Sequence, residues 1–156
     1  MAGARGRAAH GIIRAMAILS AQHEQEVKRE LDKMQGPAKL VVFASELGGE
    51  TNSQTVALAK EVAALSERLT VEVLNPYIDR DRAAAYGLEA APSIVVEGER
   101  DYGIRFLGFP GGYEFANLID SIIVASSGEP GLADDTKASL DALAEDVTIK
   151  VFTTPT

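Results

Sequence analysis

The stretch that most constrains this chain is KLVVFAS, residues 39–45, a nearly continuous run of β-branched and other apolar residues. Such a run predicts a strand that is buried on both faces by helices. TVEVL, residues 70–74, predicts a second strand. The segment between the two strands carries apolar residues at helical spacing, namely Leu58, Val62, Leu65 and Leu69. Strand, helix and strand in this order predict a βαβ unit with parallel strands.

Three further segments predict helices. Ser20 is a candidate N-cap for a helix that runs to about Met34, with Val27 and Leu31 on its apolar face. A short helix is expected over residues 79–87, with Gly87 at its C-terminal end. A stronger amphipathic helix is expected over residues 113–128, and its predicted buried residues are Phe115, Leu118, Ile119 and Ile122.

Residues 93–97 and 103–108 predict an antiparallel hairpin with its turn at Gly98. The whole order is then helix, strand-helix-strand, helix, strand-strand-helix. It predicts an α/β fold with a mixed four-stranded sheet flanked by helices, which corresponds to a thioredoxin-like domain. For the helix after the first strand, the expected N-cap is Thr51, Asn52 or Ser53.

Composition excludes several classes of function. The chain of 156 residues contains no cysteine, which removes disulfide scaffolds, thiolate zinc sites and cysteine nucleophiles. Its net charge of -8 disfavours nucleic acid as a partner. His10 and His23 have no spaced carboxylate partner, so we expect no metal site and no cofactor. The apolar stretches are far shorter than the roughly 20 residues that cross a bilayer, and a cytoplasmic location without membrane contact is expected.

Two segments carry a more specific resemblance. In AAPSIVV, Pro92 stands directly before a strand and resembles the cis-proline segment of thioredoxin folds. Residues 102–126, YGIRFLGFPGGYEFANLIDSIIVAS, resemble the first unit of the protein disulfide oxidoreductases, glutaredoxin-like proteins with two tandem thioredoxin units. They are also similar to the N-terminal domain of the flavoprotein subunit of alkyl hydroperoxide reductase. Where these families commonly have Gly-His-Glu-Phe, this chain has Tyr113 in place of the histidine.

The resemblance implies where a redox site would lie. In these families a Cys-x-x-Cys can sit before the helix that follows the first strand. Counting without a gap places GETN there, with Gly49 and Asn52 in the two cysteine positions. Neither residue supplies the thiolate that thiol chemistry needs. The segment of Ala91 and Pro92 is the expected site for an extended peptide, through backbone hydrogen bonds.

Other interpretations of the polar segments are weaker. LGGETNS, residues 47–53, has a helix N-terminus that would attract an anion, but Glu50 opposes one and no lysine is present. A glycine turn followed by a helix start is the preferred interpretation, both there and for GFPGG, residues 108–112. The acidic pairs Asp79/Asp81 and Asp134/Asp135 are expected to be helix-start charges.

The C-terminal part predicts the beginning of a second unit. We expect a linking helix in residues 129–146, over 132–146 with Asp134 or Asp135 as its cap, and then a strand over 147–152. TIKVFTTP resembles AKLVVFAS, as an internal repeat would. In the two-unit oxidoreductases a segment like VFTTPT is followed immediately by Cys-Pro-Tyr-Cys. The resemblance therefore places the active site directly after Thr156.

The predicted organisation has four parts. Residues 1–15 are a flexible extension or follow from a misassigned start, and residues 16–128 form a thioredoxin-like unit without Cys-x-x-Cys. Residues 129–146 link this unit to residues 147–156, the first strand of a truncated second unit. A truncated gene, a deliberate fragment and a UGA codon for selenocysteine would each explain the ending.

Two functions follow from the sequence. The first is a redox-inactive N-terminal unit of a thiol-disulfide oxidoreductase, with protein thiols, protein disulfides or a reductase as partners. The second is a redox-silent docking module that binds a peptide near Ala91 and Pro92. The exposed strand 147–152 would also allow two copies of the chain to pair.

Overall fold

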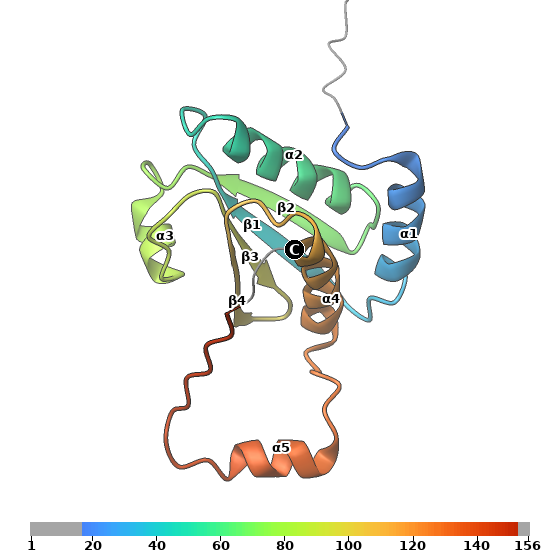
Figure 1. Ribbon diagram of the computed structural model, residues 1–156, viewed down its shortest axis with the longest axis vertical. Helices are drawn as coiled ribbons and strands as arrows, with labels where there is room; N and C mark the ends of the chain where they lie inside the picture. Colours follow the sequence, from blue (N-terminus) through green and yellow to red (C-terminus); the bar gives the residue numbers. More distant parts are fainter. Residues whose placement is uncertain (1–16, 153–156) are drawn as a thin grey trace, which may run out of the picture.

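The structure, a computed structural model, describes residues 17–152 as a four-stranded sheet with helices on both faces (Figure 1). The predicted extension, 1–15, and the final residues 153–156 lie outside the described residues. In chain order the elements are α1 (Ala21–Leu31), β1 (Ala38–Phe43), α2 (Glu50–Ala63), β2 (Leu69–Leu74), α3 (Arg80–Ala85), β3 (Ser93–Glu97), β4 (Asp101–Leu107), α4 (Tyr113–Ser127) and α5 (Asp134–Asp141). The predicted order of elements is confirmed as far as α4.

The sheet has the strand order β2-β1-β3-β4. β1 pairs in parallel with β2 and antiparallel with β3, and β3 pairs antiparallel with β4. Phe43 lies opposite both Leu74 and Ser93, and Ser93 lies opposite Leu107. The C-terminal ends of β1, β2 and β4 and the start of β3 therefore lie at the same end of the sheet, where the strands pass into loops. We call this the loop edge, and it comprises residues 44–50, 75–81, 88–92 and 108–114.

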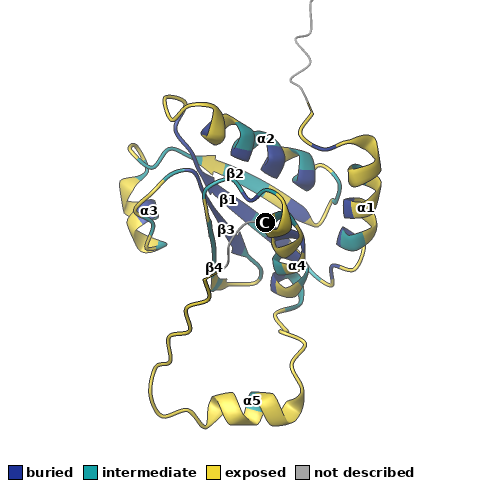
Figure 2. Cartoon of the chain, viewed as in Figure 1, coloured by how far each residue is buried: buried dark blue, intermediate teal, exposed yellow. Residues whose placement is uncertain are grey.

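β1 lies at the centre of the core. Leu40, Val41, Val42 and Phe43 have no exposed surface, which confirms the predicted strand buried on both faces (Figure 2). Leu40 and Val42 pack into the cluster formed with α1, α2 and α4, and Val41 and Phe43 pack toward α3. Burying each of these side chains contributes about 1.5–3 kcal/mol to folding. The run KLVVF thus forms a strand whose two faces supply core side chains to the helices on both sides of the sheet.

The predicted N-cap of α1 is confirmed, whereas the predicted N-cap of α2 is wrong. Ser20 caps α1, and its hydroxyl accepts a hydrogen bond from the His23 N–H at 3.2 Å. The predicted cap of α2 at Thr51, Asn52 or Ser53 is wrong, because the helix begins earlier, with Gly49 as its N-cap and no side-chain cap. The reason is that the Asn52 side chain bonds backwards to the preceding loop instead.

α4 packs tightly against the β3–β4 turn. It buries Leu118, Ile119 and Ile122 as predicted, whereas Phe115 is only half-buried. A Cβ atom at Gly98 would lie 1.8 Å from the carbonyl oxygen of Ala125, so only glycine fits this turn. Among the helices of residues 17–152, none combines the length and the apolar composition that a bilayer crossing requires.

The C-terminal segment differs from its prediction. The linking helix is shorter than 132–146, and its N-cap is Ala133 rather than Asp134 or Asp135. No residue of α5 is buried, so no packing extends the helix further. Residues 147–152 form no strand, and Ile149 is 81% exposed. A strand requires a paired neighbour, and no strand of residues 17–146 pairs with this segment.

Candidate functional site

The candidate site lies at the loop edge, where four connecting segments meet. The Ala44 N–H donates to the Leu74 carbonyl at 2.9 Å, so the loop after β1 leaves the sheet beside the loop after β2. The Gly108 N–H donates to the Pro92 carbonyl at 2.8 Å, which holds the end of β4 beside the start of β3. The edge therefore brings the predicted positions 49, 52, 91 and 92 to the same end of the sheet.

Gly49 and Asn52 both belong to the start of α2. Gly49 has φ +78° and ψ −169°, a backbone conformation that side-chain-bearing residues rarely adopt. A cysteine in the same conformation would be strained. The assignment of these two residues to the cysteine positions stays a prediction, and the backbone at residue 49 now requires glycine rather than a thiol.

Asn52 holds the loop after β1 in place. Its side chain is 4% exposed; Oδ1 accepts from the Ser45 N–H and Nδ2 donates to the Gly48 carbonyl, both at 2.8 Å. Gly48 approaches so closely that a Cβ there would lie 2.4 Å from the Asn52 amide. The first turn of α2 therefore carries a hydrogen-bonded amide that fixes residues 45–48.

A groove of about 570 Å³ runs from this loop along α2. Its floor includes Val56 and Val73, and Asn52 lies at one end. At the other end Glu61 accepts hydrogen bonds from the backbone N–H groups of Ile18 and Leu19, at 2.9–3.0 Å. These contacts fasten the chain before α1 to the last turn of α2.

The predicted peptide site at Ala91 and Pro92 lies across the edge from α2. The Ala91–Pro92 peptide bond is cis, as the resemblance implied. Pro92 is buried and Ala91 is half-buried, so only Ala91 contributes accessible surface. The Ser93 hydroxyl donates to the Ala90 carbonyl at 2.5 Å, which fixes the backbone just before β3.

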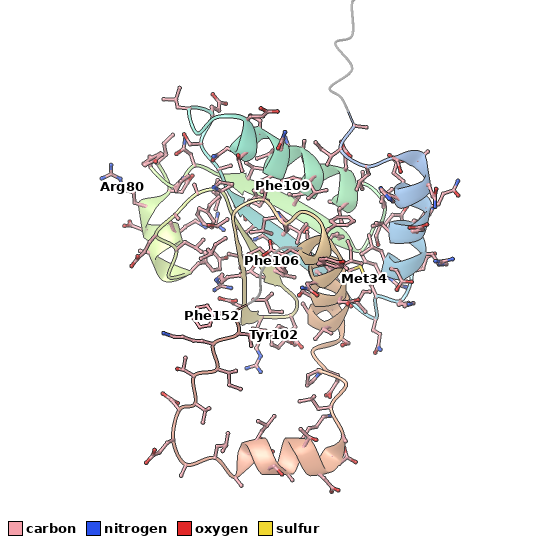
Figure 3. The ribbon with its side chains drawn as sticks, viewed as in Figure 1. Met34, Arg80, Tyr102, Phe106, Phe109 and Phe152 are labelled. Carbon is pink, nitrogen blue, oxygen red and sulfur yellow. The ribbon has the colours of Figure 1, made fainter. Side chains whose placement is uncertain are left out.

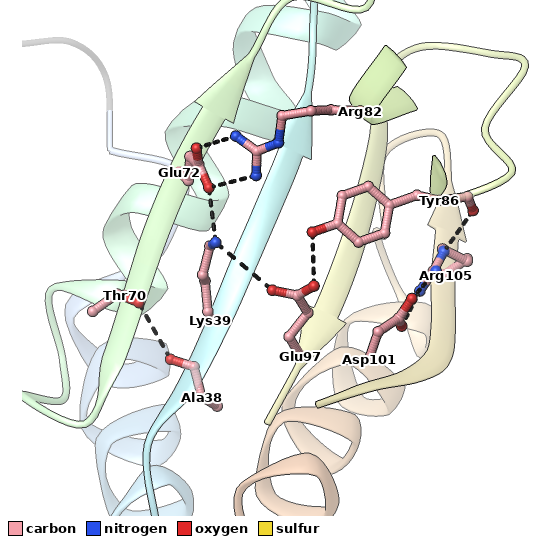
Figure 4. A network of polar contacts seen from close by, with 9 residues as sticks. All are labelled: Ala38, Lys39, Thr70, Glu72, Arg82, Tyr86, Glu97, Asp101 and Arg105. Carbon is pink, nitrogen blue, oxygen red and sulfur yellow. Dashed lines mark hydrogen bonds and ion pairs between the residues drawn. The ribbon is translucent and has the colours of Figure 1, made fainter. Parts of the chain in front are cut away.

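α3 is held over the sheet by a network of charged side chains that sequence reasoning missed (Figure 4). Arg82 donates to both carboxylate oxygens of Glu72, and Lys39 lies between Glu72, at 2.8 Å, and Glu97, at 3.7 Å. The Tyr86 hydroxyl donates to Glu97 at 2.7 Å. Because Glu72, Lys39 and Glu97 stand on three adjacent strands, they are cross-strand neighbours, and only the strand register would have predicted this.

The network shifts the pKa values of its members. The hydrogen bonds from Arg82, and then from Lys39, lower the pKa of Glu72 to about 2. The hydrogen bond to Glu72 raises the pKa of Lys39. Burial raises the pKa of Tyr86, and its hydrogen bond to Glu97 adds to that rise. All of these shifts favour the paired charge states at neutral pH, so the network keeps α3 in place rather than supplying an acid or a base.

Large apolar side chains at the loop edge are a second feature that the sequence did not predict. They stand in all four segments, and four of them are exposed: Leu47, Tyr77, Ile78 and Tyr113. Leu107, the last residue of β4, is exposed just before the fourth segment. Phe109, by contrast, packs against the core (Figure 3). Within residues 17–152 no group of three or more His, Cys, Asp or Glu side chains could hold a metal ion.

The fold and this edge define a thioredoxin-like domain whose sequence has no thiol. A crystal structure of a protein disulfide oxidoreductase from Aeropyrum pernix matches with a TM-score of 0.70 and 29% identity, over 80% of this chain and 55% of that chain. The alkylhydroperoxide reductase AhpF from Enterococcus faecalis matches with a TM-score of 0.69 and 21% identity, over 80% of this chain and 61% of that one. Both are thioredoxin-like, which confirms the resemblance drawn from Pro92 and residues 102–126.

Sequence comparison adds a longer relative. A protein named NADH dehydrogenase, from Ferdinandcohnia aciditolerans, is 31% identical over 115 residues, which are 72% of this chain and 19% of that protein. No model of a known protein family matches the chain. The chain thus spans about a fifth of this relative and about half of the oxidoreductase.

Proposed function

We propose that this chain is a redox-inactive thioredoxin-like unit of a thiol-disulfide oxidoreductase. The observation that supports the proposal is a thioredoxin-like sheet in a chain whose sequence contains no cysteine. Gly49 and Asn52 are the residues that we assign to the positions of a Cys-x-x-Cys. Disulfide exchange begins when a thiolate attacks a disulfide sulfur, and neither residue can do so. The unit contributes a fixed edge and a binding surface, and the thiol comes from elsewhere in the enzyme.

We place the active thiol or selenol in a second unit, directly after Thr156. Two observations support this placement: TIKVFTTP resembles AKLVVFAS, and the oxidoreductase from Aeropyrum pernix is nearly twice as long as the part that matches. Protein thiols, protein disulfides or a reductase are then the partners of the whole enzyme. A selenol is more acidic than a thiol and would serve as the same nucleophile.

The coding sequence beyond codon 156 tests this placement. We expect either a cysteine codon or UGA as codon 157, followed in frame by Pro-Tyr-Cys. A different stop codon at that position, or an open frame without this motif, would rule the second unit out. A UGA codon followed by the motif would select selenocysteine over cysteine.

A second candidate is a docking module that works without any oxidoreductase. The exposed Tyr77, which lines a groove together with Ala91, favours it, since a partner would cover this surface. The two candidates differ in disulfide reduction. The oxidoreductase unit requires activity in the longer protein, whereas the docking module requires peptide binding by this chain and no activity in any longer product.

A further inference from the structure

β2 is the outermost strand on one side of the sheet, and only its inner side pairs with a neighbour. The strand order is β2-β1-β3-β4, and β2 runs parallel to β1 over Leu69–Leu74. The Ala44 N–H donates to the Leu74 carbonyl at 2.9 Å, so the even-numbered residues of β2 face β1. Since successive residues of a strand alternate in direction, Val71 and Val73 point their N–H and C=O groups outward. Among residues 17–152 no strand pairs with these groups.

The strand Leu69–Leu74 lacks the features that keep the side of a sheet from pairing with another chain. Such features are proline, β-bulges, and lysines or other unpaired charges along the strand. LTVEVL contains no proline, its register with β1 is regular, and its only charged residue is Glu72. The Glu72 carboxylate is paired with Arg82 and Lys39 on the α3 face (Figure 4). The outer side of β2 is therefore open to a further strand.

The opposite side of the sheet, formed by β4, is less regular. The register of β3 and β4 shifts between Val96 and Glu97, and Gly103 in β4 has φ +82°. Such features bend a strand and interrupt a continuous ladder. β4 also carries the ion pair of Asp101 and Arg105. An added strand thus meets a regular, unprotected ladder at β2 and not at β4.

Apolar surface lies beside β2 on the α2 face of the sheet. Val73 is 41% exposed and lines the groove of about 570 Å³ together with Val56 and Ala57 of α2. Leu69 and Val71 stand on the same face of β2 and pack into the core cluster beneath α2. A strand added to the outer side of β2 would cover this apolar surface as well as pair with the backbone.

We propose that the outer side of β2 pairs with β2 of a second copy of this chain, antiparallel and with Val71 opposite Val71. Two four-stranded sheets then form one continuous sheet of eight strands. The same surface of each copy is used in such a two-fold arrangement, so the assembly closes at two copies. This inference goes beyond the proposed function and does not depend on it.

The side chains of β2 select this register. With Val71 opposite Val71, Leu69 lies opposite Val73, so every pair on the groove side is apolar. On the other face Glu72 lies opposite the hydroxyl of Thr70. A register with Val71 opposite Val73 would instead place Glu72 opposite Glu72, and like charges directly opposite each other are unfavourable. A register centred on Val73 pairs fewer residues, since β2 ends one residue later.

The charges on this side of the molecule favour a second copy over a strongly charged partner. Glu72 is balanced by its two basic partners. Lys60 in the groove and Arg68 directly before β2 offset the groove residues Glu46 and Glu61. The surface around β2 is thus close to neutral, although the whole chain has a net charge of -8. A neutral, self-complementary strand matches it, and salt should favour the pairing because it screens the repulsion between the two acidic chains.

Sedimentation velocity of the 156-residue chain over a range of concentrations tests the assembly. We expect a dimer whose dissociation constant falls about threefold between roughly 0.05 and 0.5 M salt. Val73→Lys puts an unpaired charge on the pairing side and should weaken the dimer by about tenfold or more. Leu107→Lys, on β4, is the matched control and should leave the dimer unchanged. Both residues are exposed, so each variant should keep the circular dichroism spectrum of the original chain.

A single cysteine in this cysteine-free chain tests the register. Directly opposite residues of this kind have Cα atoms about 5.5 Å apart, which a disulfide can span. Val71→Cys should therefore give a disulfide-linked dimer on mild oxidation. Val73→Cys is the matched control, because its two copies would stand four residues apart along the strands, about 14 Å, and should stay unlinked.

Several results would overturn the proposal. They are a chain that stays monomeric up to about 200 μM, a dimer that is insensitive to Val73→Lys, and linkage through residue 73 instead of residue 71. Chains without residues 1–16 or without residues 146–156 should still form the dimer. If the dimer is lost with either segment, or appears only after residues 1–16 are removed, that segment occupies β2 and the proposal is wrong.

Discussion

Replacing Asn52 with alanine should remove the contact that fixes the loop after β1. The buried Ser45 N–H would lose its only side-chain acceptor, and an unpaired buried donor costs about 1–3 kcal/mol. Gly48 is an exposed residue, so water can replace the lost Nδ2 donor at its carbonyl, and the loss of this bond costs about 0.5 kcal/mol. Alanine returns about 0.5 kcal/mol through its higher helix propensity.

The expected net loss is therefore about 2 kcal/mol, or a fall in melting temperature of about 10 °C for a unit of this size. Urea unfolding followed by circular dichroism measures the first quantity, and hydrogen exchange of the Ser45 amide reports the bond itself. Asn52→Asp keeps the acceptor for Ser45 and adds a negative charge at the helix start, so it should lose less than about 1 kcal/mol. Ser53→Ala is the matched control on the exposed side of the same turn. If Asn52→Ala is no less stable than Ser53→Ala, or leaves Ser45 protected, the reasoning is refuted.

Three further predictions concern the frame around the site. Gly98→Ala should cost about 2–4 kcal/mol, because its Cβ would meet the Ala125 carbonyl oxygen, whereas Glu99→Ala should change the unfolding free energy by less than about 0.5 kcal/mol; equal effects would contradict the close contact. Glu72→Gln should cost less than about 1 kcal/mol at pH 7, because the carboxylate is one-third exposed and screened. The pKa of the Glu72 carboxyl group is lower in the folded than in the unfolded state, so the stability lost in Glu72→Gln should vanish as the pH falls from 4.5 toward about 2. A stability loss that persists at low pH would show that it does not arise from the charge. Deleting residues 146–156 should leave the melting temperature unchanged and improve solubility, since the described part of that segment is exposed; a large fall would show that it packs on the unit.

The fold was predictable because its signals are local and repetitive. A short run with β-branched residues such as KLVVF favours a buried strand, and the helical spacing of Leu58 and Val62 predicts the helix between the strands. Ser20 was predictable as a cap for the same reason, since the signal lies within one turn. The strand predicted over 147–152 does not form, because this segment has strand-like residues but no strand to pair with.

The assignment of Gly49, Asn52, Ala91 and Pro92 to a site stays a prediction. The strand register brings the segments that carry them to the same end of the sheet. The role of Asn52 depends on the path of the loop before it, which an isolated sequence does not specify. The exposure of Leu47 and Leu107 depends on how the loops leave the strand ends, so only the three-dimensional arrangement identifies it.

The central claim is that this unit supports disulfide chemistry carried by another unit. The most direct measurement is the reduction of a protein disulfide by the protein translated beyond codon 156, with residues 17–128 either present or deleted. The account predicts turnover in the longer protein, none in the 156-residue chain, and a higher KM for the protein disulfide after the deletion, with a small disulfide reduced as before. The account would be contradicted by a longer protein without turnover, or by an unchanged KM for the protein disulfide after residues 17–128 are deleted.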